Sequence, residues 1–270
     1  MNNFSDSKIL PKKRYGQNFL TDKNIINNIV ELSGDIENRD VLEIGGGTGN
    51  LTQRLLKENP RKLVVLEIDK DLIPTLQKIG HSKHKNIEII CEDILKFNIL
   101  DHFKQPPIIV GNLPYNTSTK ILANLLKPWP LTWDRLVLMF QIEVARRIVS
   151  QPNCKTYGRL SLLSQFRSKP TIKMKISNKV FFPIPKIKSA IVVFEKKEPS
   201  EKDVNFELFL FIIKQSFSQR RKKLVNCLKE FFPNISNVLY DCGIKIDSRA
   251  ENLSINDYQI ITRKLNEDKV

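Results

Sequence analysis

Short apolar runs rich in β-branched residues recur along the first half of the chain, and helix-like segments separate them. These runs cover residues 41–44, 63–68, 87–90, 108–110 and 136–140. Strands that alternate with helices predict βαβ units and a mostly parallel, Rossmann-like sheet. Two later runs, 171–177 and 190–194, have no room between them for an ordinary crossover helix. They predict an antiparallel pair at one edge of the sheet.

The pattern changes after a charged, Pro-containing segment, KKEPSEKD at 196–203, which marks a boundary. Beyond it, apolar residues repeat at helix spacing from Phe206 to Ile213, and 220–231 forms a second candidate helix. Ser254 followed by Asp257 resembles a capping box that opens a last helix. We therefore expect an α/β catalytic domain over 1–198, with an N-terminal arm of about 1–20, and a small all-helical domain over 199–270.

The charge of the chain is strongly uneven. Its 270 residues carry a formal net charge of +15, and no acidic residue occurs between Glu143 and Glu195. Such a field suggests a polyanionic partner, either nucleic acid or an anionic membrane surface. A solvated lysine-rich face is the plain alternative, although acidic residues normally intersperse such a face. The stretch offers no clear amphipathic helix with an apolar side, which favours nucleic acid.

Other composition features exclude several classes of protein. No apolar run is long enough to span a membrane, and the N-terminus lacks the apolar core of a secretory signal. Four scattered cysteines without a CxxC pair fit neither a zinc knuckle nor a disulfide framework. His81 and His84 lack Cys or carboxylate neighbours, so we expect no metal. A monomer in a reducing cytoplasm is the simplest expectation.

A glycine-rich turn follows the first expected strand. Gly45-Gly46-Gly47-Thr48-Gly49 stands between that strand and a helical pattern from Asn50 to Glu58. Glycines in a strand–turn–helix unit let the backbone approach a ligand closely, although a tight turn without a ligand is the alternative. Glu67, at the end of the second strand, is placed to accept both hydroxyls of a ribose, and Asp69 is the rival for that role.

The third strand ends in Cys91-Glu92-Asp93. Asp93 is placed to accept a hydrogen bond from an adenine amino group, as in methyltransferase sites, or to cap the following helix. A nicotinamide dinucleotide would need its pyrophosphate at the helix N-terminus, whereas S-adenosylmethionine relies on the glycine turn and carboxylates. Asp93 and the antiparallel edge pair favour S-adenosylmethionine over a dehydrogenase cofactor.

The fourth strand ends in Gly111-Asn112-Leu113-Pro114-Tyr115. Ligands of open α/β sheets bind at the carboxyl ends of strands, so Asn112 and Tyr115 should face the reactive group, although the tetrapeptide alone could be a simple turn. An exocyclic amine on a base is a poor nucleophile because its lone pair is delocalised into the ring. Hydrogen bonds accepted by the Asn112 side-chain oxygen and the Leu113 carbonyl would localise that lone pair, and Tyr115 could stack on the base.

From about Tyr15 to Asn252 the chain resembles ribosomal RNA adenine dimethyltransferases of the KsgA type. Seven motifs in the same order carry the likeness: YGQNFL (15–20), LEIGGGTGNLT (42–52), LEID (66–69), GNLPY (111–115), YGRLSLLSQF (157–166), FFPIPKIKSA (181–190) and SFSQRRKKLVNCL (216–228). Two departures are small. Gly46 stands where Pro is common, which should loosen the turn, and Ile142 replaces a frequent Lys, so we assign it no role.

The resemblance implies an S-adenosylmethionine site, with S-adenosylhomocysteine as product and no metal. The implied cofactor-binding residues are Asn18, Leu20, Gly45, Glu67, Asp93 and Asn112. The implied catalytic residues are Asn112, Leu113, Pro114, Tyr115 and Phe181. In this likeness Asn18 and Leu20 close over the methionine part, and Phe181 covers the face of the target adenine opposite Tyr115.

The resemblance also implies the substrate, two adjacent adenines in the 3′-terminal hairpin loop of 16S rRNA in the small ribosomal subunit or its precursor. The expected RNA-binding residues are Arg146, Arg147, Arg159, Lys186, Arg220, Arg221, Lys222 and Lys223, and the positive field should surround the entrance for the adenine. The alternatives are a large-subunit rRNA adenine dimethyltransferase of the antibiotic-resistance type, a dinucleotide dehydrogenase, and, compatible with the enzyme, a ribosome-assembly factor that acts mainly by binding.

Overall fold

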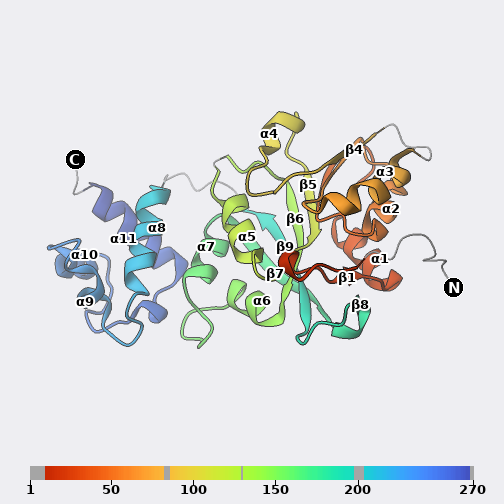
Figure 1. The fold of residues 1–270 in the computed structure, drawn as a ribbon. Coiled ribbons are helices and arrows are strands. Elements are labelled where there is room, and N and C mark those ends of the chain that lie inside the picture. The colour runs from red at the N-terminus through yellow and green to blue at the C-terminus, as the bar shows by residue number, and fades with distance from the viewer. Residues whose placement is uncertain (1–9, 82–85, 129, 198–203, 268–270) are drawn as a thin grey trace. The chain divides into compact units, whose positions relative to one another are not determined.

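The structure is a computed structural model that describes residues 10–81, 86–128, 130–197 and 204–267 (Figure 1). The first nine residues of the expected arm and most of the expected boundary segment 196–203 lie outside this range. The chain divides into two compact units. The first comprises residues 1–145 and 171–195, and the second comprises residues 146–170 and 196–270. No helix in the described ranges is long and apolar enough to cross a membrane.

The first unit is built on a seven-stranded sheet with strand order β4-β3-β2-β5-β6-β9-β7. Five strands run parallel, and β9 pairs antiparallel with β6. The strands are β2 (Asp40–Ile44), β3 (Lys62–Leu66), β4 (Ile87–Ile90), β5 (Ile108–Asn112), β6 (Arg135–Gln141), β7 (Ser168–Ile176) and β9 (Ser189–Lys196). The predicted α/β class with an antiparallel edge is confirmed.

Burial explains why the central strands read as continuous apolar runs rather than as alternating ones. Every residue of β2 is buried, as are the last four of β3 and the first four of β5. Strands of a parallel sheet are buried on both faces, so both sets of side chains are apolar. The edge strand β7 differs, because Lys169, Thr171, Lys173 and Lys175 are exposed and the residues that alternate with them are not. Lysines on an edge discourage pairing with other chains.

Helices and short 3₁₀ turns connect these strands. They are η1 (Lys13–Tyr15), α1 (Lys23–Leu32), α2 (Asn50–Leu56), η2 (Lys70–Leu72), α3 (Ile73–His81), α4 (Ile99–His102), α5 (Ser118–Leu126), α6 (Ile142–Ile148) and η3 (Asn178–Val180). Two very short strands, β1 (Phe19–Leu20) and β8 (Phe181–Phe182), form a separate antiparallel sheet. This small sheet ties the N-terminal arm to a loop that precedes β9.

The second unit is helical and has its own apolar core. Its elements are α7 (Arg159–Arg167), α8 (Phe206–Ser216), α9 (Leu224–Leu228), α10 (Ile235–Asp241), η4 (Ala250–Asn252) and α11 (Ile255–Glu267). The core joins Tyr157 and Leu162 to residues of α8 and α11, such as Phe209 and Tyr258. The sequence places 146–170 with the catalytic domain, whereas the structure packs this segment into the helical core.

The predictions for the helices of this unit had mixed outcomes. The capping box is confirmed, because the Ser254 N–H donates to the Asp257 carboxylate at 2.8 Å and the Asp257 N–H donates to Ser254 Oγ at 3.2 Å. The helix predicted over 220–231 is wrong in extent, since α9 covers only Leu224–Leu228. Lys223 is extended and forms a β-bridge with Arg249, so the basic cluster before it is not helical.

Candidate active site

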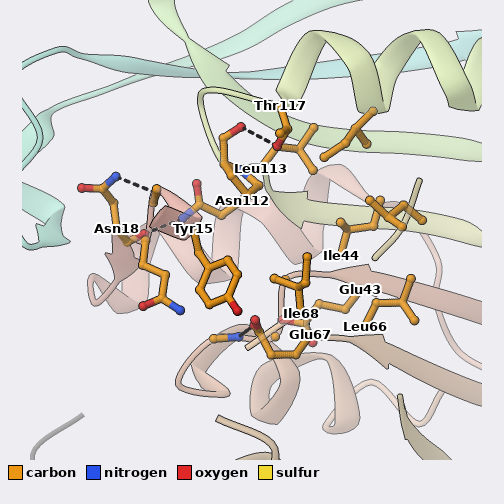
Figure 2. Close-up of a pocket in the computed structure, with 18 of the residues that line it drawn as sticks. Tyr15, Asn18, Glu43, Ile44, Leu66, Glu67, Ile68, Asn112, Leu113 and Thr117 are labelled. Carbon is orange, nitrogen blue, oxygen red and sulfur yellow. Dashed lines mark hydrogen bonds between the residues drawn. The ribbon is translucent and has the colours of Figure 1, made fainter. Parts of the chain in front are cut away.

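A cavity of about 370 Å³ lies where β2, β3 and β5 end in the first unit (Figure 2). The glycine turn, the loops after β3, β4 and β5, and residues 14–20 of the N-terminal arm line it. This is the carboxyl edge of the parallel strands, where open α/β sheets bind ligands. The structure therefore brings together Asn18, Leu20, Gly45, Glu67, Asp93, Asn112, Leu113, Pro114 and Tyr115 around one cavity.

The turn between β2 and α2 depends on backbone conformations that favour glycine. Gly45 has φ +79° and Gly47 has φ +55°. The Gly45 N–H donates to the Leu66 carbonyl at 2.8 Å, which joins the turn to the end of β3. The Gly47 N–H donates to Glu67 Oε2 at 2.9 Å. The turn and the carboxylate at the end of β3 are therefore a single hydrogen-bonded unit.

Gly46 was expected to loosen this turn, and the structure assigns it a packing role instead. A Cβ atom at this position would lie 2.5 Å from a methyl carbon of Val65 and 2.9 Å from one of Leu76. Both neighbours are buried core residues of β3 and α3. The absence of a side chain lets α3 and β3 approach the turn closely, so here the glycine tightens the packing.

Glu67 and Asp69 compete in the sequence for the role of ribose ligand, and the structure separates them. Glu67 lines the cavity and accepts N–H groups from Gly47 and Asp69, each at 2.9 Å. Burial raises the pKa of Glu67, although those backbone hydrogen bonds oppose the shift. Asp69 is not among the residues that line the cavity. Glu67 thus remains the predicted ribose ligand.

Asp69 is instead occupied by the N-terminal arm. Its Oδ1 accepts from Lys12 Nζ at 2.6 Å and its Oδ2 accepts from Gln17 Nε2 at 2.8 Å. Burial acts to raise the pKa of Asp69, but the hydrogen bonds from Lys12 and Gln17 outweigh it and hold the pKa below its ordinary value. Lys12 also pairs with Asp71. Asp69 is therefore a structural carboxylate that anchors the arm.

Glu43, at the carboxyl end of β2, is a buried carboxyl group that also borders the cavity. Loss of solvation raises its pKa to about 8, a hydrogen bond from the Thr52 hydroxyl at 2.6 Å opposes that shift, and the nearby Glu67 adds to it. With a pKa of about 8, the Glu43 carboxyl is protonated at neutral pH.

The side chain of Asp93 caps the turn that follows β4, which is one of the two roles that the sequence predicts for it. Its Oδ1 accepts the Leu95 N–H at 3.0 Å, which closes the turn after β4. The same residue lines the cavity with Glu92, Ile94 and Leu95. A carboxylate has two oxygens and about four acceptor positions, so capping this turn leaves capacity to accept a hydrogen bond from an adenine amino group.

Asn112 ends β5, and its side-chain amide has a determined orientation. Nδ2 donates to the backbone carbonyl of Asn18 at 2.8 Å (Figure 2). A carbonyl oxygen accepts and cannot donate, so the amide NH₂ must face Asn18. Oδ1 is left on the other side of the amide, where it can accept from a ligand. The predicted role of Asn112 as an acceptor for an amine requires this orientation.

Tyr115 is fixed by a partner from β9, whose start lies at the carboxyl edge of the parallel strands. Its hydroxyl and Ser189 Oγ lie 2.7 Å apart, and Ser189 is fully buried at the start of β9. Burial raises the pKa of Tyr115, so the phenol is neutral. Pro114 precedes it, and the Pro114 carbonyl accepts the Ser118 N–H at 2.9 Å at the start of α5. The turn that holds Tyr115 is thus anchored at both ends.

The structure does not bring Phe181 to the cavity as the sequence predicts. Phe181 is 2% exposed, belongs to the apolar core and is not among the lining residues, whereas its neighbour Phe182 is 59% exposed. The strand register does not separate the two aromatics, because Phe181 is opposite Leu20 and Phe182 is opposite Phe19, and both Phe19 and Leu20 line the cavity. Burial separates them, since Phe181 is in the core and Phe182 is exposed.

The residues expected to bind RNA are all exposed, and they are divided between the two units. Lys186 belongs to the first unit, and the second unit holds Arg146, Arg147, Arg159, Arg220, Arg221, Lys222 and Lys223. Arg220 also has an internal role, since it pairs with Glu251 at 2.7 Å. A continuous positive field around the entrance stays a prediction.

Sequence reasoning missed Lys12, Gln17 and Ser189 as residues that organise the site. The signal for two of them was present, because Gln17 and Ser189 lie within the quoted motifs YGQNFL and FFPIPKIKSA. Lys12 had no signal beyond its charge. Within the described residues, no group of three or more His, Cys, Asp or Glu side chains could hold a metal ion, and His84 is not in that range.

Comparisons with known proteins agree with this geometry. A family model described as "Ribosomal RNA adenine dimethylase" matches residues 10–267. The chain is 39% identical over 255 residues to ribosomal RNA small subunit methyltransferase A of Cereibacter sphaeroides, covering 94% of this chain and 92% of the relative. It is 38% identical to the protein of the same name from Paracoccus denitrificans, covering 94% and 91%.

Two solved structures resemble the whole chain. A dimethyladenosine transferase from Plasmodium falciparum superposes with a TM-score of 0.80 at 26% identity, covering 93% of this chain and 98% of that one. The 23S rRNA methyltransferase ErmE superposes with a TM-score of 0.71 at 25% identity, covering 92% and 100%. Both similarities extend beyond the sheet domain to most of the chain.

Proposed function

The chain belongs to the ribosomal RNA adenine dimethylase family, and from this premise we propose that it dimethylates the exocyclic amines of two adjacent adenines in the 3′-terminal hairpin loop of 16S rRNA. The methyl donor is S-adenosylmethionine. The observation that carries the proposal is the orientation of Asn112, whose Oδ1 is kept available by the hydrogen bond between Nδ2 and the Asn18 carbonyl.

The cavity fits S-adenosylmethionine better than a dinucleotide. A pyrophosphate would need the free N–H groups of the glycine turn, but the Gly47 N–H is donated to Glu67. Glu67 itself would repel a phosphate and would accept the two hydroxyls of a ribose. Asp93 would hold the adenine amino group, Gly45 would allow close approach, and Asn18 and Leu20 would cover the methionine part.

Two neutral hydrogen-bond acceptors would prepare the target amine to accept the methyl group. When bound, the cofactor supplies an electrophilic methyl group on a sulfonium. Asn112 Oδ1 and the Leu113 carbonyl would accept the two N–H groups of the target amine and localise its lone pair for in-line attack. In that attack the N–C bond would form as the S–C bond breaks, and the nitrogen would then lose a proton to water. Positioning is the main catalytic device, since good orientation of reactants recovers about 7–11 kcal/mol.

Aromatic stacking would hold the extruded base. An adenine within stacked RNA must be splayed out to reach the cavity, and Tyr115 offers a platform fixed by Ser189. Ring faces also attract the positive charge that develops on nitrogen, by about 0.5–2 kcal/mol. Likeness to the family assigns the second platform to Phe181, whereas exposure favours Phe182. The monomethylated amine remains nucleophilic, so the same residues would support a second transfer.

The small-subunit target is preferred because the more similar relatives carry that name. Identity to small subunit methyltransferase A proteins is 38–39%, against 25% to the 23S rRNA enzyme ErmE. Exposed basic residues in both units would contact RNA phosphates. A role in subunit biogenesis through binding to immature subunits would accompany the enzymatic activity.

The experiment that tests the proposal is expression in a strain lacking its own 16S rRNA dimethyltransferase. Primer-extension stops on both rRNAs would map dimethyladenine. We expect stops at two adjacent adenines near the 3′ end of 16S rRNA. Stops on 23S rRNA alone would establish the large-subunit alternative, and binding of NAD without binding of S-adenosylmethionine would replace the methyltransferase with a dehydrogenase. An Asn112→Ala variant that still binds immature subunits would demonstrate the separate role in biogenesis.

A further inference from the structure

The N-terminal arm contacts several separate parts of the active site. Its residues line the cavity from Arg14 to Leu20. The Asn18 carbonyl receives the Asn112 amide at 2.8 Å, and the Leu20 carbonyl receives the Asn50 side chain, at the start of α2, at 2.9 Å. The strand β1 also pairs with β8, which carries the two candidate aromatics. The position of the arm therefore determines the geometry on the acceptor side of the cavity.

The orientation of Asn112 depends on the arm through one hydrogen bond. An amide side chain presents NH₂ on one side and oxygen on the other, and a flip of the group exchanges a donor for an acceptor. The N–H groups of a target amine need a hydrogen-bond acceptor, so Asn112 must present its Oδ1 to them. The Asn18 carbonyl enforces this arrangement only while the arm holds that carbonyl 2.8 Å from Nδ2.

An ion pair and hydrogen bonds far along the sequence anchor the arm. Lys12 Nζ binds Asp69 at 2.6 Å and also pairs with Asp71, and the Lys12 N–H donates to Gln17 Oε1 at 2.7 Å. Gln17 Nε2 then donates to Asp69 at 2.8 Å. Asp69 is only 3% exposed at its side chain, so this anchor is partly shielded from water. We call Lys12, Gln17, Asp69 and Asp71 the clasp.

The clasp connects Glu67, on the side of the cavity next to the glycine turn, with Asn112, on the side next to β5. Asp69 donates its N–H to Glu67, the predicted ribose ligand, and Gln17 is next to Asn18 in the chain. A continuous path of contacts thus runs from Glu67 through Asp69 and Gln17 to Asn18 and Asn112. Lys12 itself is not among the residues that line the cavity, so it acts on the reaction only through others.

We propose that Lys12 is a positioning residue for methyl transfer, which holds the N-terminal arm on Asp69 and Asp71 so that the Asn18 carbonyl orients the Asn112 amide. The inference rests on the proposed function and adds to it a residue that does not contact either reactant. It assigns the clasp an effect on the rate of methyl transfer rather than on the stability of the fold.

The test compares three lysine variants. Lys12→Met should lower the single-turnover rate at saturating S-adenosylmethionine by roughly 10- to 100-fold, since small misplacements of reacting groups have effects of this size. Its dissociation constant for S-adenosylmethionine should stay within about threefold of the native value, and Lys12→Arg should restore most of the rate because a guanidinium binds two carboxylates. Lys62→Met is the matched control, since it removes another ion pair, with Glu88, at the start of β3.

Each outcome is decisive. Equal loss of rate in Lys12→Met and Lys62→Met, or no loss in either, would overturn the inference. A weakened dissociation constant with an unchanged rate would assign the clasp to cofactor binding and would also overturn it. Failure of the native protein to methylate any rRNA would remove the proposed function instead. Hydrogen exchange of the amides at 15–21 would then still test the anchor, because Lys12→Met should raise their exchange rates.

Discussion

The two halves of the cavity, which we propose bind the cofactor and the methyl acceptor, present different chemical groups, although both lie at the same edge of one sheet. The cofactor half, at the ends of β2, β3 and β4, presents the carboxyl groups of Glu43, Glu67 and Asp93 beside backbone N–H donors. The acceptor half, at the end of β5, presents an amide, backbone carbonyls and a phenol. No side chain of the sequence GNLPY is ionised at neutral pH.

This difference matches what each half would bind. Hydroxyl and amino groups of a nucleoside, and a cationic sulfonium, suit carboxylates. The target amine must be unprotonated, because it attacks through its lone pair. Neutral hydrogen-bond acceptors orient this amine, whereas a carboxylate would bind the protonated form more strongly. The comparison indicates that charged carboxylates favour binding of the methyl donor, whereas the orientation of neutral groups favours reaction of the methyl acceptor. Substitutions in the two halves should therefore separate binding from rate.

The largest effect is expected at Asn112. By our proposal, Asn112→Ala removes the hydrogen-bond acceptor for the target amine, so it should abolish dimethylation, while binding of S-adenosylmethionine should be weakened but still present. Calorimetric binding and mapping of dimethyladenine measure the two separately. The exposed Asn226, in the other unit, provides the control through Asn226→Ala. Full dimethylation by Asn112→Ala would end the assignment of this half as the acceptor site.

A smaller effect is expected at Glu67, and it should change cofactor binding rather than the rate. Glu67→Gln retains the shape but loses the charge that receives the Gly47 and Asp69 N–H groups and, by our proposal, two hydroxyls. Hydrogen bonds to a charged acceptor contribute about 1–1.5 kcal/mol more than neutral ones, so the loss of charge at two hydroxyls should raise the dissociation constant for S-adenosylmethionine roughly 30- to 150-fold. The rate at saturation should change little. The half-buried Glu88, which pairs with Lys62 outside the cavity, gives the Glu88→Gln control, and a loss confined to the saturated rate would contradict the division of the cavity.

The aromatic residues should give intermediate effects. Stacking of a base on an aromatic side chain contributes about 1–3 kcal/mol, so Tyr115→Ala should reduce the rate roughly 5- to 150-fold. Tyr115→Phe keeps the ring, loses only the Ser189 contact and should cost much less. The pair Phe181→Leu and Phe182→Leu identifies the second platform. Exposure predicts that Phe182→Leu lowers the rate and that Phe181→Leu lowers mainly the melting temperature, and the reverse result would favour the family likeness.

Glu43 should affect stability in a pH-dependent way. The pKa of its carboxyl is about 8 in the folded protein and 4.5 in the reference state, so the folded protein binds the extra proton between these values. The stabilisation is therefore complete below about pH 4.5 and is lost as the pH rises through about 8. Glu43→Gln should melt a few degrees higher than the native protein at pH 9 and similarly at pH 5. A melting difference that does not change with pH would contradict the burial argument.

The smallest effect is expected at single basic residues of the second unit. If Arg221 contacts a phosphate, Arg221→Ala should weaken rRNA binding a few-fold and lower the slope of log K against log salt by about 0.7–0.9. Arg220→Ala should destabilise the helical unit as well, because Arg220 pairs with Glu251. A slope unchanged by Arg221→Ala would remove that residue from the RNA contact.

Most of the sheet was predictable from sequence, and so was the meeting of Glu67, Asp93 and Asn112 around one cavity. Each central strand is a buried apolar run, and the order of βα units places Glu67, Asp93 and Asn112 at one edge whatever the details of packing. The extent of the helix at 220–231 was not predictable, because Lys223 follows a long-range bridge to Arg249 instead of its local propensity. The same applies to Asp69, whose partner Lys12 is 57 residues away.

By itself, the sequence determined the α/β class, the glycine turn, the family and the residues at the strand ends, because these depend on local periodicity and on the order of elements. Only the tertiary structure decided which way the Asn112 amide faces, that Ser189 holds Tyr115, and that Phe181 is in the core while Phe182 is exposed. Those facts depend on contacts between residues 74 to 163 positions apart in the sequence, such as the strand register between β1 and β8. A shift of one residue in a strand pair exchanges the two faces, and no local pattern in the chain specifies it.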